Sequence, residues 1–295
     1  MPQTQVLTPA GVDELVAALA QATPRTRLLA GGTDLVRAIR RPGSEPDLLI
    51  DLTGLEELSS IRLDDDTLRV GALATFHQLQ WDPLLREHAL CLCLAAAQVG
   101  SAQIRNAGTI GGNIANASPC ADGATALTAL GAEVTTVDGA GRVRNRPIGE
   151  VLLGPNRTSL AHDEAITEFS FPALGSAHRS AFAKIGSRMT VSVARLSAAL
   201  AVRFDAAAGT LTDVRVALGA VGGTAFRASR LEESLAGRPA DEETARLFAD
   251  GCVVAVQESI PGRYSLPYKQ HAAVGLAYDA WNMLAISPPC EPAWA

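Results

Sequence analysis

The sequence predicts a mixed α+β chain of two domains, and three observations lead to that prediction. Up to a proline at residue 172, short apolar runs alternate with helical patterns. Further along, two long apolar segments flank a turn at residues 206–209, as in an antiparallel pair, and three helical patterns follow. The chain has 295 residues, 47% of them hydrophobic, which is enough to bury two cores. We predict domains at residues 1–175 and 176–290.

The first domain should begin with a helix, a strand and a glycine turn. Residues 8–22 carry apolar side chains on one helical face, and the apolar run at 27–32 ends in a Gly-Gly pair. A threonine and an aspartate then favour a helix start, so a helix is expected at 33–41, before a Pro-Gly pair. Two strands should follow, at 46–55 and 67–75.

The remaining elements are predicted in the same way. Residues 84–100 should form one buried helix, and 122–148 should run from a helix into a hairpin that turns at "DGAG". A last strand, at 164–172, closes the first domain. In the second domain, antiparallel strands are expected at 187–205 and 211–223, although the first could begin as a helix. Helices are expected near 227–236, 241–258 and 267–285.

Composition excludes several classes of protein. A net charge of −6 argues against a nucleic-acid or anionic-membrane surface, because both favour clustered Lys and Arg. We find no signal peptide and no membrane span, and we expect a cytoplasmic protein. The five cysteines lack metal-site spacing and are expected to be reduced thiols, with Cys91 and Cys93 as apolar helix residues rather than ligands. No metal site is predicted.

The first glycine loop, "LLAGGTDLV" at residues 28–36, has the order strand, glycine turn, helix start. Glycines let backbone N–H groups approach a ligand closely, and a helix N-terminus adds partial positive charge, so the loop suits a phosphate or diphosphate. It matches neither the dinucleotide fingerprint nor the Walker loop. Alone, it is more simply a structural turn.

The second loop, "TIGGNIANASPCAD" at residues 109–122, repeats this design. Its Gly-Gly pair is expected behind a short strand and is followed by neutral donors, so the two loops together could hold a diphosphate without cationic side chains. Asp122 would repel a diphosphate, so a ribose or ribityl hydroxyl is the better partner. Helix capping by Asp122 is the alternative.

These two loops, about 80 residues apart, resemble the flavin loops of the FAD-binding medium subunit of molybdenum hydroxylases, a family with xanthine and carbon monoxide dehydrogenases. The resemblance covers nearly the whole chain, including "VGALATFHQL" at 70–79, "FAKIGSRMTVSVARLSAAL" at 182–200 and "VALGAVGGTAFRASRLEESLAG" at 216–237. It implies a PCMH-type (vanillyl-alcohol-oxidase) FAD-binding domain of two α+β lobes, then a smaller domain with an antiparallel sheet and helices. The patterns alone also allow a Rossmann-like unit in the first part.

The resemblance also implies which residues contact FAD. The first loop would wrap the diphosphate, and the second would supply a hydroxyl and amides, while Asp122 would contact the sugar-alcohol portion. Two further segments would pass the cofactor, the second of them near the adenine. The implied contacts are Leu29, Ala30, Gly31, Gly32, Thr33, Asp34 and Leu35 in the first loop, Thr109, Gly112, Asn113, Asn116 and Asp122 in the second, and Val70, Gly71 and Ile166 elsewhere.

Lys184 is the one residue to which the resemblance gives a catalytic role. It falls in a strand that runs close to the isoalloxazine ring in similar enzymes, where a cation could stabilise the reduced, anionic flavin. The alternative is a surface lysine at a strand edge. Arg188, four residues later, has a weaker claim.

The family resemblance implies an electron-transfer subunit. A large subunit with a molybdenum cofactor would hydroxylate the substrate, and a small [2Fe-2S] subunit would pass electrons to the FAD of this chain. NAD is one candidate acceptor, beside a quinone or oxygen. An independent flavin reductase or oxidase of the same fold, and a scaffold without FAD, are the alternatives. Flavin content of the purified protein separates the scaffold from the other two.

Overall fold

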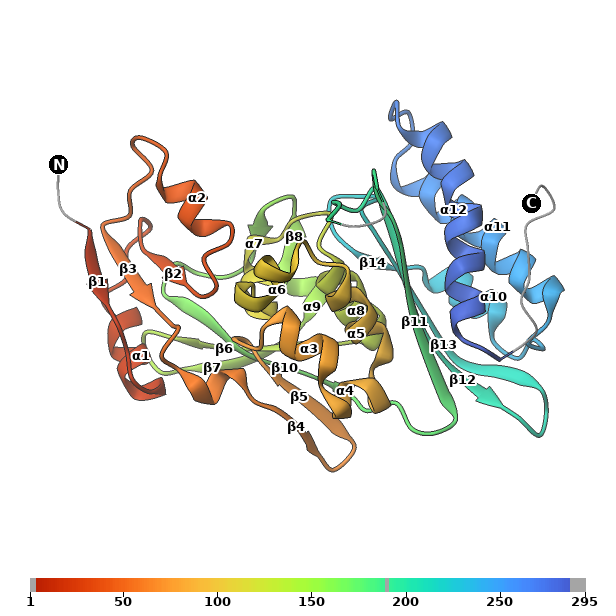
Figure 1. Cartoon of the computed structure of the whole chain (residues 1–295), viewed down its shortest axis with the longest axis horizontal. Helices are drawn as coiled ribbons and strands as arrows, with labels where there is room; N and C mark the ends of the chain where they lie inside the picture. Colours follow the sequence, from red (N-terminus) through yellow and green to blue (C-terminus); the bar gives the residue numbers. More distant parts are fainter. Residues whose placement is uncertain (1–3, 189–190, 287–295) are drawn as a thin grey trace.

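The computed structural model describes residues 4–188 and 191–286. Three main sheets lie one after another along the long axis of the molecule, each with helices packed against it (Figure 1). The strands of the second and third sheets are antiparallel throughout, and only the small first sheet is parallel. The fold class of two α+β lobes followed by a third α+β unit is confirmed.

The first lobe is a three-stranded sheet in the order β1-β3-β2. Helix α1 buries Leu15 and Leu19 against it, which accounts for the apolar helical face in the sequence. Because the parallel sheet ends after three strands, no doubly wound Rossmann-like sheet forms. The elements are β1 (Gln5–Leu7), α1 (Val12–Leu19), β2 (Arg27–Leu29), α2 (Leu35–Ile39), β3 (Leu48–Asp51) and the 3₁₀ turn η1 (Glu56–Ser59).

The second lobe is a five-stranded antiparallel sheet in the order β4-β5-β10-β6-β7, with helices on one face and a small β8-β9 ribbon. Its strands are β4 (Ile61–Asp64), β5 (Thr67–Gly71), β6 (Glu133–Asp138), β7 (Val143–Pro147), β8 (Leu152–Gly154), β9 (Arg157–Thr158) and β10 (Glu164–Pro172). Its helices are α3 (Phe76–Trp81), α4 (Pro83–His88), α5 (Leu90–Ala97), α6 (Ala102–Ala107), α7 (Ile110–Asn116), α8 (Asp122–Leu130) and α9 (Ile148–Val151).

The prediction of a single helix at residues 84–100 is wrong. The chain forms α4 and α5 instead, and Ala89 between them has φ −159° and ψ 47°, outside the helical region. The carbonyl of His88 accepts a hydrogen bond from the N–H of Leu174 at 3.0 Å, and the N–H of Leu92 donates to the carbonyl of Ala89 instead of to that of His88. A tertiary contact that no local pattern reveals therefore ends α4.

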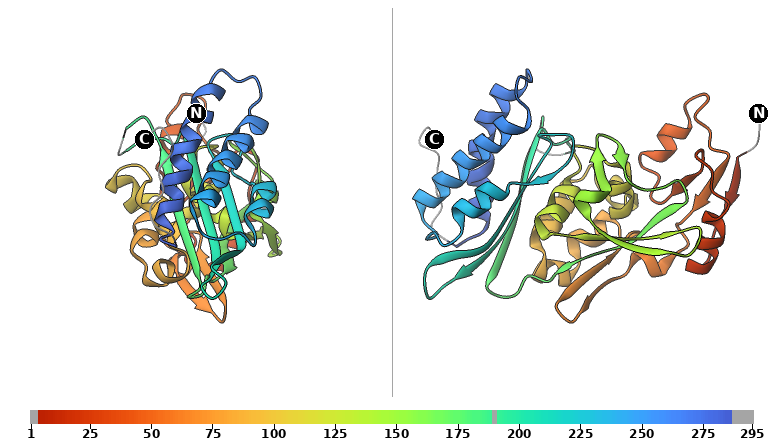
Figure 2. Two further views of the ribbon diagram at one scale, coloured as in Figure 1. Left: turned by 90° about the vertical axis from the view of Figure 1, so that its right-hand side faces the viewer. Right: turned by 180° about the vertical axis from the view of Figure 1, so that it is seen from behind.

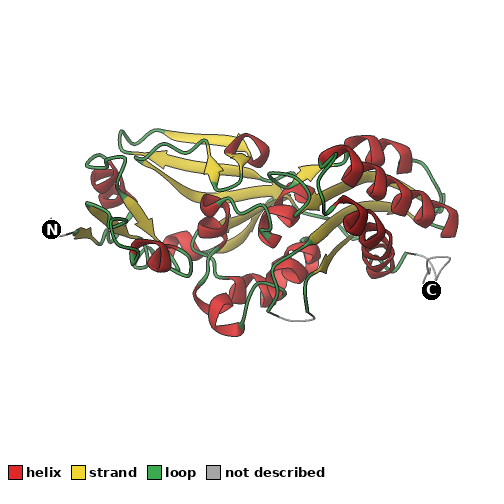
Figure 3. Cartoon of the chain, turned by 90° about the horizontal axis from the view of Figure 1, so that it is seen from above, coloured by secondary structure: helices red, strands yellow, loops and turns green. Residues whose placement is uncertain are grey.

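The third unit is a four-stranded sheet with three helices on its outer face (Figures 2 and 3). The strands are in the order β11-β12-β13-β14. The strand predicted at 187–205 begins only at Leu196, and the described residues before it, 187–188 and 191–195, are neither strand nor helix. The elements are β11 (His178–Ile185), β12 (Leu196–Asp205), β13 (Thr210–Gly219), β14 (Phe226–Arg227), α10 (Ser229–Leu235), α11 (Glu242–Ser259) and α12 (Leu266–Met283).

One hydrophobic core crosses from the second lobe into this third unit. Helix α8, with all nine residues buried, packs against α5 on one side and against β12 and β13 on the other. Phe182 of β11 and Ala199 of β12 belong to the same buried cluster as Leu127 of α8. The site described next lies at this junction.

Candidate functional site

The structure brings the two glycine loops together. A Cβ atom on Gly31 would overlap the carbonyl oxygen of Ala107, so only glycine allows the first loop to lie against the end of α6. The Nδ2 of Asn116 is 3.5 Å from the Oδ2 of Asp34, which joins the second loop to the first. Residues far apart in the sequence thus form one continuous surface.

The second loop is held in place by the segment that leads into α3. The N–H groups of Ile110 and Gly111 donate to the carbonyls of Ala74 and Ala72, at 3.0 and 2.8 Å. The predicted strand before the Gly-Gly pair is wrong, because the pair lies inside α7 and α6 precedes it. Thr109 is the N-cap of α7, and its hydroxyl accepts a hydrogen bond from the N–H of Gly112 at 3.1 Å.

The two glycines of this pair have different surroundings. A Cβ on Gly111 would lie 2.7 Å from the Cβ and carbonyl oxygen of Ala72, so Gly111 serves close packing. A Cβ on Gly112 would meet only the Oγ1 of Thr109, at 3.0 Å, and otherwise open space within the described chain. Gly112 is exposed at the loop surface, where a ligand backbone has room to pass.

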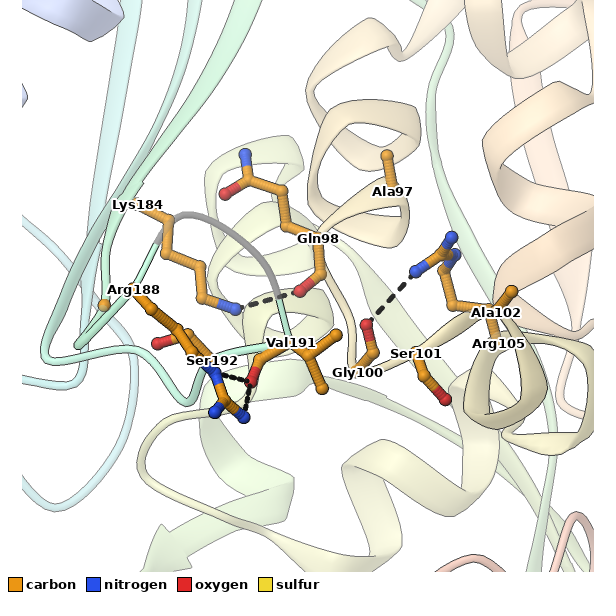
Figure 4. Close-up of a pocket in the computed structure, with 11 residues that line it drawn as sticks. Ala97, Gln98, Gly100, Ser101, Ala102, Arg105, Lys184, Arg188, Val191 and Ser192 are labelled. Carbon is orange, nitrogen blue, oxygen red and sulfur yellow. Dashed lines mark hydrogen bonds between the residues drawn. The ribbon is translucent and has the colours of Figure 1, made fainter.

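Asp122 and Lys184 form a buried ion pair at the junction of the second lobe and the third unit. The Nζ of Lys184 on β11 lies 2.5 Å from the Oδ2 of Asp122 on α8, and the two side chains are only 6% and 5% exposed. The same Nζ donates to the carbonyl of Gln98 at 3.0 Å, as Figure 4 shows. The pair connects α8, β11 and the end of α5.

This pair corrects two alternatives that the sequence left open. Asp122 does not cap α8, because it is the first residue of that helix and the N-cap residue, Ala121, makes no side-chain cap. Lys184 does lie on an edge strand, β11, but its side chain points inward and is buried. A surface role for Lys184 is therefore wrong.

Two oxygen atoms at this site are buried and have no hydrogen-bond partner among the described residues: the Oδ1 of Asp122 and the Oδ1 of Asn113. Buried oxygens without partners are costly, so such atoms indicate a missing donor. Burial raises the pKa of Asp122 to about 6, and the attraction of Lys184 only partly opposes this effect. A cofactor that carries hydroxyl groups would supply the hydrogen-bond donors that these two oxygens lack.

A pocket of about 300 Å³ opens beside Lys184 (Figure 4). The end of α5, the turn into α6 and α6 itself form one wall, and β11 with the chain after it forms the other. Three cationic residues line it, Arg105, Lys184 and Arg188, and no acidic residue is among its described lining. Arg105 donates to the carbonyls of Val99 and Gly100, at 3.3 and 3.2 Å, which fixes the turn between the two helices.

Sequence reasoning missed most of this wall. It gave no role to Gln98, Gly100, Ser101 or Arg105. The positive φ of Gly100, 48°, reflects the tight corner between α5 and α6. A glycine followed by a serine N-cap was the available signal, since that order is typical of a sharp helix start.

Three predicted contact residues belong neither to the two loops nor to the described lining of the pocket. Val70 and Ile166 are buried in the core, on β5 and β10. A Cβ on Gly71 would overlap the carbonyl oxygen of Leu58, so packing against η1 already requires a glycine there. Their contact with a cofactor stays a prediction. Leu29, Ala30, Gly32, Thr33 and Leu35 are partly buried in the first loop, as expected for residues that would contribute main-chain groups.

The cysteines and the described helices give further information. Burial raises the pKa of Cys91 and of Cys93 to about 12, so both are poorly reactive thiols in the core. Cys290 lies outside the described residues. Over residues 4–188 and 191–286 there is no cluster of three or more His, Cys, Asp or Glu side chains that could hold a metal. No helix in this part of the chain is long and apolar enough to cross a membrane.

Comparison with known families decides what this site belongs to. Residues 2–174 match the FAD binding domain in molybdopterin dehydrogenase, and residues 181–284 match the CO dehydrogenase flavoprotein C-terminal domain. The chain belongs to the FAD subunits of the molybdenum hydroxylase family. Its cofactor is FAD, and it is an oxidoreductase component.

Individual relatives of this FAD subunit cover most of its length. It is 34% identical over 252 residues to the nicotinate dehydrogenase FAD-subunit of Eubacterium barkeri, which is 84% of each chain. It is 32% identical over 250 residues to a putative xanthine dehydrogenase FAD-binding subunit of Escherichia coli strain K12, 84% of this chain and 85% of the relative. Among solved structures, carbon monoxide dehydrogenase from Hydrogenophaga pseudoflava superimposes with a TM-score of 0.86 at 29% identity, over 96% of this chain and 98% of that one.

Proposed function

We propose that this FAD subunit is the electron exit of a heteromeric molybdenum hydroxylase. A separate large subunit would carry the molybdenum cofactor and hydroxylate a purine, another N-heterocycle or an aldehyde, and a small subunit with [2Fe-2S] clusters would deliver the electrons. The acceptor would be NAD or another oxidant, and the complex would be cytoplasmic. The names of the relatives as dehydrogenase subunits support this class of reaction.

One observation carries the proposal for this chain: the two glycine loops are in contact, the second ends at a buried Asp–Lys pair whose lysine lines the pocket, and two buried oxygens of that loop have no described partner. When bound, FAD supplies the redox chemistry, because a flavin accepts electrons singly and passes a pair onward as hydride. The chain would supply the binding site and the electrostatics. Its division into an FAD-binding domain at 1–175 and a C-terminal domain at 176–290 is part of the proposal.

The loops would bind the diphosphate with backbone groups. Gly31 and Gly32 of the first loop and Gly112 of the second present no side chain, and the chain would need no cation there. Asn113, Asn116 and Asp122 would hydrogen-bond the polar groups between diphosphate and ring, where the Oδ1 atoms of Asn113 and Asp122 lack partners. The other contact residues that the resemblance implied keep their proposed places.

Lys184 would act as the catalytic cation. A buried ammonium group beside a pocket favours negative charge in that pocket, because few water molecules screen it. The pocket walls would also exclude water from the electron-transfer site.

The experiment that tests this function is purification of the complex from its natural source through a tag on this chain. We expect FAD, molybdenum and iron–sulfur clusters to copurify, and we expect the flavin to be reduced when substrate is added to the complex but not to the isolated subunit. A chain that purifies alone and oxidises or reduces a substrate by itself would instead be an independent flavin enzyme, and the proposal would fail.

A further inference from the structure

Lys184 is one of only two lysines in a chain that has 25 basic residues. The other, Lys269 on α12, donates to the carbonyl of Ala220. The other residues of this group are arginines, so the ammonium group at position 184 differs chemically from nearly all other cations of the chain.

An ammonium group has three N–H donors, and two of those on Lys184 are used by described residues. One goes to the carboxylate of Asp122 at 2.5 Å and one to the carbonyl of Gln98 at 3.0 Å. Lys184 also lines the pocket. These two bonds therefore leave one N–H of Lys184 for a ligand in the pocket.

The two hydrogen bonds of Lys184 differ in strength because their acceptors differ in charge. The bond to the Asp122 carboxylate, which is 5% exposed, is charge-assisted and therefore the stronger one, whereas the backbone carbonyl of Gln98 is a neutral acceptor. A buried lysine without a counter-ion tends to lose its proton or to move toward water. The position of the Lys184 ammonium group therefore depends on Asp122.

We infer that Asp122 is a positioning residue: its Oδ2 holds the Lys184 ammonium group in place, so that Lys184 presents its remaining N–H to the flavin. This deepens the proposed function and rests on it for the identity of the ligand. Asp122 thus has two tasks, because Oδ1 stays available for the cofactor while Oδ2 binds Lys184.

The inference makes a prediction about the sign of a shift. If Asp122 acted only through its own negative charge, Asp122→Asn would remove a repulsion and raise the reduction potential of the flavin. If Asp122 acts through Lys184, the same substitution lowers the potential, because the Lys184 ammonium group is no longer held beside the flavin. The two mechanisms thus predict opposite shifts.

The test measures the flavin midpoint potential in the FAD-loaded protein for Asp122→Asn, Lys184→Met and the double variant. We expect all three potentials to be lower than that of the wild type, and we expect the double variant to match Lys184→Met, since one variant already removes the shared effect. A raised or unchanged potential in Asp122→Asn, or additive shifts in the double variant, would overturn the inference.

Thr125→Val provides the matched control. Thr125 lies one turn further along α8, is buried at the same junction and contacts Ser197 of β12 at 3.2 Å, but it does not line the pocket. Its substitution should change stability and leave the potential unchanged. A shift in this control as large as in Asp122→Asn would show that any disturbance of the junction moves the potential, and it would also count against the inference.

A second measurement needs no cofactor. In protein labelled with ¹⁵N-lysine, only Lys184 and Lys269 give side-chain ammonium signals, so Lys184 can be followed directly. We expect the Lys184 signal to exchange with water about tenfold faster in apo Asp122→Asn than in the apo wild type, or to disappear, because a charge-assisted hydrogen bond is lost. Lys269 serves as the internal reference.

These two measurements separate the two hypotheses. If the wild type retains no FAD but Asp122→Asn alters the Lys184 signal, the proposed function fails and the positioning role stands. If FAD binds and neither the signal nor the potential responds to Asp122→Asn, the positioning role fails and the proposed function stands.

Discussion

At the scale of single residues, neighbouring glycines of α7 separate packing from binding. Gly111 lies against Ala72, where any side chain would be crowded, whereas Gly112 is open apart from the hydroxyl of Thr109. A side chain at Gly112 would therefore act on a ligand more than on the fold. Gly111 and Gly112 can therefore be tested independently, Gly111 for packing and Gly112 for ligand binding.

We predict that Gly112→Val removes FAD without unfolding the chain, because the new side chain would occupy the space through which the diphosphate should pass. The flavin absorbance per mole of purified protein should fall at least about tenfold, the factor that a loss of ~1.4 kcal/mol in binding produces. The free energy of unfolding of the apoprotein should change by less than about 1 kcal/mol, as for an exposed helical position.

The control for this prediction is Gly149→Val in α9. A Cβ on Gly149 meets nothing within 4 Å, and Gly149 does not lie in either glycine loop. This variant should keep its flavin. Loss of FAD from both variants, or from neither, would contradict a specific role for Gly112.

Asp122 should also make the stability of the apoprotein depend on pH. Burial raises the pKa of Asp122 to about 6, above the value of about 3.9 in an unfolded chain. Between these values the folded state binds more protons than the unfolded state, so this stabilising contribution is complete below pH 4 and is lost as the pH rises through 6. The change is at most about 3 kcal/mol, the equivalent of two pKa units.

Urea unfolding of the wild type and of Asp122→Asn, between pH 4 and pH 7, tests this effect. We expect the free energy of unfolding of the wild type, relative to that of the variant, to fall as the pH rises. A constant difference would show that Asp122 has the same pKa in both states.

At the scale of elements, the contact between the first loop and α6 brings the two halves of the site together. Gly31 allows this contact, and the hydrogen bonds of Ile110 and Gly111 to residues 72–74 fix the second loop. Neither α2 nor α7 is long, with five and seven residues, so the loops depend on tertiary contacts rather than on strong helix dipoles.

We predict that Gly31→Ala destabilises the fold as well as FAD binding, in contrast to Gly112→Val. The new methyl group would overlap the carbonyl oxygen of Ala107, which should lower the free energy of unfolding of the apoprotein by about 1–3 kcal/mol. Gly54→Ala is the matched control, because its Cβ would lie 3.8 Å from the nearest atom, the carbonyl oxygen of Pro9. Chemical denaturation of the two apoproteins measures the difference, and equal stabilities would contradict the close contact.

The sequence allowed most elements to be predicted, because their signals are local. The apolar face of α1, the hairpin of β6 and β7 and the three C-terminal helices appear where the patterns indicated. The break at Ala89 could not be predicted, because it depends on a hydrogen bond between His88 and Leu174, which are distant in the sequence.

The sequence pointed to residues that the structure brings together at the candidate site, but not to the pairing of Asp122 with Lys184. Family resemblance pointed to Asp122 and Lys184 separately, each as a contact of the cofactor. Their ion pair joins two units whose relative position no local pattern specifies. The pocket wall at Gln98 and Arg105 was missed because its contacts are made largely by backbone carbonyls, which leave little trace in a sequence.

At the scale of the whole molecule, the shared core predicts cooperative unfolding. Buried side chains of the third unit belong to the same cluster as those of the second lobe, and α8 contacts both. We expect a single thermal transition, with FAD at 100 times its Kd raising the free energy of unfolding by about 2.7 kcal/mol. Calorimetry with and without FAD measures both, and two separate transitions, only one of which responds to FAD, would contradict the expectation.

The burial of α8 also limits how this chain can be recombined with its relatives. All nine residues of that helix are covered by elements from both sides of the junction, including α5, β12 and β13. A chimera that joins the N-terminal half of this chain to the C-terminal half of a relative would place α8 against side chains that did not evolve with it. A functional chimera should therefore require α5, α8 and the strands β12 and β13 to come from the same parent protein. This should hold even though the boundary between the two domains lies between α8 and β12 in the sequence.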